Sequence, residues 1–71
     1  MMLINSNKVI SLQDLILSDD TNDKTLICIY SSEGKFICRD NWYADKVLEY
    51  AERFGKAHRA GTGRTITFQL I

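Results

Sequence analysis

The longest regular pattern of hydrophobic and polar positions runs from Asp40 to about His58. At a helical advance of about 100° per residue, its apolar residues fall on one arc and its charged residues on the opposite arc. The apolar arc comprises Tyr43, Ala44, Val47, Leu48, Tyr50, Ala51 and Phe54. The charged arc comprises Asp45, Lys46, Glu49, Glu52, Arg53 and Lys56. We therefore expect one long helix over about 41–58, with its apolar arc packed on the core.

The two ends of this helix are less sharply marked than its centre. Asp40 or Asn41 is suited to cap its start. Its end is open between Gly55 and a position near Gly61. We interpret residues 61–64 as an ordinary turn, because phosphate-binding loops lead from a strand into a helix and this segment leaves a helix for a strand.

A second, shorter helix is predicted near the start of the chain, over about 12–17. Ser11 is suited to cap it, with Asp14 three residues further on, and Leu12, Leu15 and Ile16 share one side. A polar, acidic segment over 18–24 then predicts a surface loop.

Residues 25–39 predict a β-hairpin, because two runs of β-branched and aromatic residues flank a glycine-containing turn. A three-residue loop over 32–34 leaves only Gly34 in the left-handed conformation. This loop sets Tyr30 opposite Phe36, Ile29 opposite Ile37 and Cys28 opposite Cys38. We expect the facing cysteines to stay reduced, as small buried hydrophobes, although the register would also allow a disulfide.

The last segment, 64–71, alternates between apolar and polar residues. Ile66, Phe68 and Leu70 share one face, which predicts a half-exposed antiparallel strand. We expect this strand to pair with the hairpin and to leave its outer edge open, where a second copy of the chain would form a homodimer.

Together these elements predict a single α+β domain spanning 1–71. Its sheet would have three or four antiparallel strands, with the long helix on one face and the short N-terminal helix beside it. A chain of 71 residues is too short to divide its apolar residues between two cores.

The charged residues are balanced over the whole chain but unevenly distributed along it. The formal net charge is zero, which argues against a protein that binds polyanions by bulk attraction alone. Residues 1–33 nevertheless carry a net charge of −3 (two lysines, five acids), and residues 34–71 carry +3 (seven basic residues, four acids). The chain shows neither a signal peptide nor a membrane-spanning segment, so we expect a cytoplasmic protein.

Little in the sequence indicates catalysis. The single histidine, His58, has no serine or cysteine beside it in the sequence, and one histidine with two hairpin cysteines is not a complete metal-ligand set. We therefore expect no enzyme activity, no metal and no cofactor, and we interpret His58 as a structural residue or a cation near a helix end.

A basic segment over 53–64 is the first candidate binding site. Its candidate anion or nucleic-acid ligands are Arg53, Lys56, His58, Arg59 and Arg64. Such a cluster can bind phosphates, or it can simply complement the dipole at a helix end. Tyr30 and Phe36, with Phe68 as a further candidate, would add base-stacking surface only if their sheet face points away from the long helix.

Trp42 is the second candidate, because it falls in the middle of the charged arc of the predicted helix. With Lys46, Glu49 and Arg53 it would form a solvent-facing stripe suited to protein contacts. The alternative is that the first helical turn folds Trp42 back over the sheet or the short helix. Taken together, the sequence favours a small non-enzymatic protein-interaction module, a regulator or inhibitor that acts by occluding a partner protein. The alternative is a nucleic-acid-binding protein that uses the basic segment 53–64.

Overall fold

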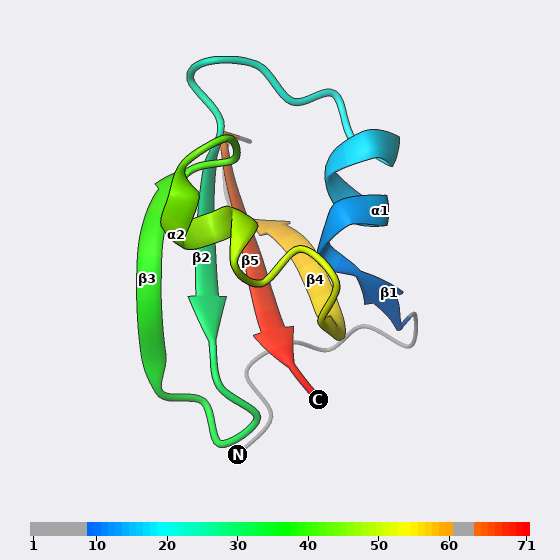
Figure 1. The fold of residues 1–71 in the computed structure, drawn as a ribbon, viewed down its shortest axis with the longest axis vertical. Coiled ribbons are helices and arrows are strands. Elements are labelled where there is room, and N and C mark those ends of the chain that lie inside the picture. The colour runs from blue at the N-terminus through cyan, green and yellow to red at the C-terminus, as the bar shows by residue number, and fades with distance from the viewer. Residues whose placement is uncertain (1–8, 61–63) are drawn as a thin grey trace.

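The computed structural model describes residues 9–60 and 64–71, without the side chains of His58 and Ala60 (Figure 1). In chain order its elements are β1 (Ile10–Ser11), α1 (Leu12–Ser18), β2 (Leu26–Tyr30), β3 (Phe36–Asn41), α2 (Asp45–Leu48), β4 (Phe54–Ala60) and β5 (Thr65–Leu70). The turn predicted over 61–64 lies outside the described residues except for Arg64. No helix in the described part of the chain is long and apolar enough to cross a membrane.

The strands form one five-stranded sheet in the order β1-β4-β5-β2-β3. Three of its four pairings are antiparallel, and the central pair of β2 and β5 is parallel. The sheet is therefore mixed, and the prediction of three or four antiparallel strands was wrong. A parallel pair needs a long connection, and here that connection contains β3, α2 and β4.

The core lies on one face of the sheet, which we call the helix face because α1 and α2 cover it (Figure 1). Ile27 and Ile29 of β2 face Ile66 and Phe68 of β5 in register. Val47 of α2 packs against this layer and belongs to the same buried cluster. The fully buried side chains are Leu12, Ile27, Ile29, Val47, Ile66 and Phe68. This layer confirms the alternation predicted for the C-terminal strand.

The long helix predicted over about 41–58 does not exist. Only Asp45–Leu48 is helical, and a series of tight turns then leads into β4. The N–H groups of Tyr50, Ala51 and Arg53 each bond to the carbonyl three residues earlier. Of the predicted apolar arc, Val47 is buried, whereas Tyr43, Leu48 and Phe54 are about half exposed.

Tertiary hydrogen bonds explain why the helix stops early. The carbonyls of Ala51 and Arg53 accept from the N–H groups of Gln13 and Leu12, at 2.8 and 3.0 Å. These two donors belong to the first turn of α1, which has no intrahelical acceptors for them. In a continuous helix the same carbonyls would bond within that helix, so ending α2 early supplies the partners that α1 requires.

The short helix predicted over about 12–17 is present as α1. The Oγ of Ser11 accepts from the N–H of Asp14 at 3.1 Å, which is the predicted N-cap. Leu12 and Ile16 are buried against the core. The side chains of Asp19 and Arg59 form an ion pair that ties the end of α1 to β4.

The C-terminal strand occupies the centre of the sheet rather than its edge. Strand β5 pairs with β2 on one side and with β4 on the other. Both of its backbone edges are therefore paired. The prediction of an open outer edge, on which a homodimer through that strand depended, was wrong. The outer strands are β1 and β3.

Candidate interaction surface

Strand β3 is the long outer strand of the sheet (Figure 1). Its six residues pair with β2, and within the described part of the chain no strand pairs with its other side. Phe36, Arg39 and Asp40 are exposed. The outer N–H and C=O groups of such a strand can accept a further strand.

The turn before β3 has the conformation predicted for the loop over 32–34. Gly34 adopts a φ of 87°, the left-handed conformation that glycine takes at little cost. The Oγ of Ser31 accepts from the N–H groups of Glu33 and Lys35, at 3.3 and 3.1 Å. The three-residue loop is therefore confirmed, and so is the pairing of Tyr30 with Phe36.

One residue further on, the predicted register fails because β3 contains a bulge. Ile29 lies opposite Cys38, and Ile37 is the extra residue between Phe36 and Cys38. Arg39, rather than Cys38, therefore lies opposite Cys28. A bulge of this kind inserts one residue and shifts the alternation that follows it.

The bulge decides which side chains of β3 share a face. Cys38 and Asp40 pair with the helix-face residues Ile29 and Ile27. Phe36 and Arg39 therefore both lie on the opposite face, which we call the far face. In a regular strand, residues three positions apart lie on opposite faces.

The same shift separates the two cysteines, which are both free. Cys28 lies on the far face and Cys38 on the helix face, so their side chains diverge and the register does not suit a disulfide. Burial raises the pKa of the Cys28 thiol, which the nearby Arg39 guanidinium partly offsets. Burial is also the main reason that the pKa of Cys38 is raised. Raised pKa values keep both thiols protonated and poorly nucleophilic at neutral pH.

The far face carries an aromatic pair. The rings of Tyr30 and Phe36 meet edge to face, with centroids 5.7 Å apart, and Phe36 is 59% exposed. Tyr30 lies opposite Gln69 rather than Phe68, so this pair points away from α1 and α2, whereas Phe68 is buried in the core.

Trp42 does not lie on a helix. Its indole Nε1 donates to the carbonyl of Asn22 at 2.9 Å, and its ring packs partly buried against the core. Beside it, the Nδ2 of Asn41 donates to the carbonyl of Asp23 at 3.0 Å. Trp42 therefore folds back onto the core, as in the alternative interpretation, but from a turn rather than a helix, and its hydrogen bond goes to the loop between α1 and β2. Together with Asn41 it fastens that loop to the segment before α2.

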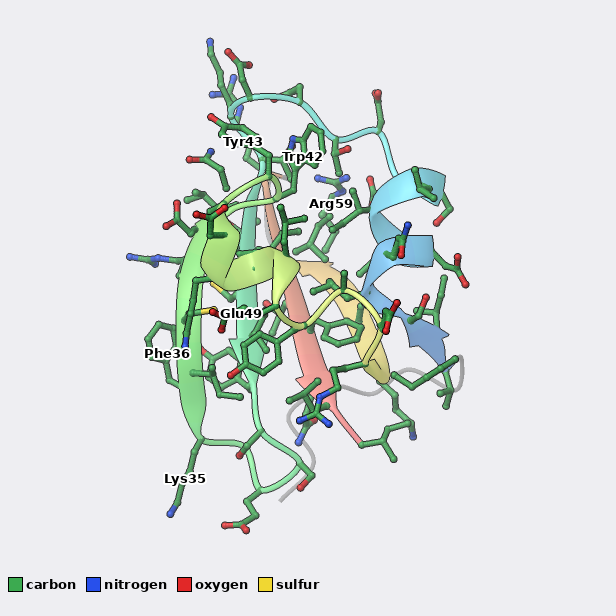
Figure 2. The ribbon with its side chains drawn as sticks, in the orientation of Figure 1. Lys35, Phe36, Trp42, Tyr43, Glu49 and Arg59 are labelled. Carbon is green, nitrogen blue, oxygen red and sulfur yellow. The ribbon has the colours of Figure 1, made fainter. Side chains whose placement is uncertain are left out.

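The other members of the predicted stripe are not arranged along one helix. Lys46 and Glu49 of the α2 region form an exposed ion pair at 3.5 Å. Lys46 also lies 5.9 Å from the centroid of the Tyr50 ring. Arg53 follows in the turn before β4 and lines an open hollow of about 360 Å³ with Ser31, Ser32, Phe54, Leu70 and Ile71. Figure 2 shows Trp42 near one end of the sheet and Glu49 near its middle.

The basic residues of 53–64 are likewise dispersed, because most of this segment is a strand. Lys56 pairs with Gln69 on the far face, whereas Arg59 pairs with Ile66 on the helix face and contacts Asp19. Arg53 and Arg64 lie at opposite ends of the sheet. The backbone of His58 pairs with Thr67, and its side chain lies outside the described part of the structure.

The surface that the sequence interpretation missed is the β3 edge with its flanking charges, Lys35, Arg39 and Asp40. Charged side chains are one of the features that natural outer strands carry, and Arg39 and Asp40 stand at the end of a β-branched and aromatic run. Within the described residues, no cluster of three or more potential metal ligands is present.

Comparison of the chain with protein-family models, with curated proteins and with solved structures finds no match.

Proposed function

We propose that this chain is a non-enzymatic protein-interaction module that binds a protein partner along the open edge of β3, and that it works in the cytoplasm by occluding that partner. The observation that carries the proposal is the six-residue outer strand, whose exposed residues include Phe36 and Arg39. Backbone groups on an open edge supply affinity, and the flanking side chains supply specificity. Phenylalanine and arginine are also both enriched in the buried centres of protein interfaces.

Trp42 is not part of the proposed contact surface. That indole is partly buried and bonded to Asn22, so it stabilises the fold whether or not a partner binds. Phe36 has no comparable role in the core, since more than half of it is exposed.

A site-specific photo-crosslinking experiment tests this function. A photoreactive amino acid placed at Phe36 in cells that express the chain is expected to yield a discrete crosslinked protein. The matched control is the same amino acid at Leu17, which is 75% exposed on α1, away from β3. Equal labelling at both positions, or none at position 36, would contradict binding along β3.

One observation favours nucleic-acid binding as a second candidate. Tyr30 and Phe36 point away from both helices, and the cations Arg39 and Lys56 share their face. Nuclease treatment before analysis distinguishes the two candidates. Crosslinks at position 36 that survive nuclease support a protein partner, whereas crosslinked RNA or DNA that is lost at moderate salt supports the second candidate.

A further inference from the structure

The order of side chains along β3 is self-complementary when two copies of the strand lie side by side and antiparallel. Reading outward from the bond between Ile37 and Cys38, the residues on one side are Ile37, Phe36 and Lys35, and those on the other side are Cys38, Arg39 and Asp40. An apolar residue is thus matched with an apolar one, an aromatic ring with a guanidinium, and an ammonium with a carboxylate.

From this order we propose that the occupant of the β3 edge is a second copy of the chain, paired antiparallel about a two-fold axis between Ile37 and Cys38. This inference rests on the proposed function, because it names the partner of the same edge. The two sheets would join into one continuous sheet of ten strands, and the interface would be isologous, with the same residues contributed by both copies.

The register follows from the faces of the sheet. A two-fold axis perpendicular to a sheet leaves each side chain on its own face, so only residues on the same face can lie opposite each other. The bulge places Phe36 and Arg39 together on the far face, and Ile37 packs against the core together with Cys38. The proposed axis therefore sets Phe36 opposite the partner's Arg39, and Ile37 opposite the partner's Cys38.

Neighbouring registers are unfavourable. An axis through Cys38 would set Phe36, on the far face, against Asp40, on the helix face. An axis through Arg39 would set two guanidinium groups directly opposite each other, which is destabilising. Without the bulge, Phe36 and Arg39 would lie on different faces and the proposed register would fail too.

The side chains involved are available for these contacts. Lys35, Phe36, Arg39 and Asp40 are all exposed. Figure 2 shows Lys35 and Phe36 at the same end of β3, away from the end that leads to Trp42 and Tyr43. Each facing pair occurs twice in the dimer. The dimer therefore contains two ring–guanidinium contacts and two ion pairs.

Helix α2 leaves room for a second copy. It lies on the helix face, across the half of β3 that leads to Asn41 (Figure 1). The proposed axis lies in the other half of the strand, and rotation about it carries the second α2 to the opposite end of the pair. A contact between two short strands is small, so we expect a dimer that forms with rising concentration rather than an obligate one.

Charge reversal tests the register by sedimentation equilibrium at protein concentrations up to roughly 1 mM. Lys35→Asp and Asp40→Lys each place like charges at both facing pairs, and each is expected to weaken dimerisation about tenfold. The double variant Lys35→Asp/Asp40→Lys restores opposite charges and is expected to dimerise like the original chain. An equimolar mixture of the two single variants is expected to form a heterodimer more tightly than either forms a homodimer.

The matched controls are Lys24→Asp and Asp20→Lys, two exposed reversals in the loop between α1 and β2, which are expected to leave dimerisation unchanged. Urea unfolding followed by Trp42 fluorescence confirms that every variant is folded. A chain that is monomeric throughout the range overturns the inference, as does equal weakening by the loop reversals or a mixture no tighter than its components. In those cases a crosslink from position 36 to a different protein still supports the proposed function, and its absence refutes that function as well.

Discussion

At the scale of single residues, Gly55 is a position where a side chain does not fit unless neighbouring atoms shift. It lies in β4 on the helix face, opposite Leu70 of β5. A Cβ placed there would come within 2.2 Å of the Gln69 carbonyl oxygen and 2.8 Å of the Cζ of Phe68. The missing side chain therefore allows β4 and β5 to approach and the Phe68 ring to fill the space above them.

Gly55→Ala is expected to destabilise the protein by about 1–3 kcal/mol, because backbone atoms must shift to admit one methyl group. Urea unfolding monitored by Trp42 fluorescence measures the loss. Ala57→Gly, two residues further along the same strand and face, is a control that removes a methyl group instead. Unchanged stability of Gly55→Ala would contradict the close approach of the two strands.

At the scale of elements, the segment over 45–58 shows how tertiary contacts override a local pattern. Its apolar residues recur with helical periodicity, yet it forms one helical turn, a series of tight turns and a strand. Its turns supply acceptors to α1, and its strand supplies a partner for β5. Each of these roles depends on residues far away in the sequence, so no local pattern reveals it.

The side chain of Trp42 connects the loop between α1 and β2 to the segment before α2. Trp42→Phe is expected to cost about 1 kcal/mol, since it removes the hydrogen bond to Asn22 and part of a packed ring. The measurement is thermal unfolding by circular dichroism, with Leu17→Ala, on the exposed side of α1, as a control expected to change stability by less than about 0.5 kcal/mol. Crosslinking through position 36 is expected to persist in Trp42→Phe. If Trp42→Phe keeps its full stability but loses the crosslink, Trp42 belongs to the surface that contacts the partner.

At the scale of the whole molecule, stability depends on one thin layer of side chains between the sheet and the two helices. Phe68 is its largest member and is fully buried. It belongs to the central strand and lies opposite Ile29 on one side and Ala57 on the other. A cavity at this position would weaken both halves of the sheet at once.

Phe68→Ala is expected to cost about 3–5 kcal/mol, a large part of the roughly 5–10 kcal/mol available to a small domain. Urea unfolding is expected to show a sharply lowered midpoint or no folded baseline. Phe36→Ala provides the matched control, because that ring is 59% exposed and its loss is expected to cost less than about 1 kcal/mol. Similar losses in the two variants would contradict the assignment of the two faces.

The candidate surfaces depend on the same distinction between local and long-range information. The sequence places Arg53, Lys56, Arg59 and Arg64 close together along the chain, and a helix would have kept much of that clustering. Because β4 is a strand, the alternation of its side chains sends Lys56 and Arg59 to opposite faces. The outer position of β3 in the described sheet became evident only once the strand order was known.

By itself, the sequence determined the short helix with its Ser11 cap, the hairpin with Gly34 in its turn, and the alternation of Ile66 and Phe68. Each of these depends on interactions within a few residues, such as a cap, a positive φ or the pleat of a strand. Only the tertiary structure decided the bulge in β3, the central place of β5 and the early end of the helix predicted over about 41–58. Those features depend on which distant backbone groups and side chains meet, and a local periodicity carries no information about that.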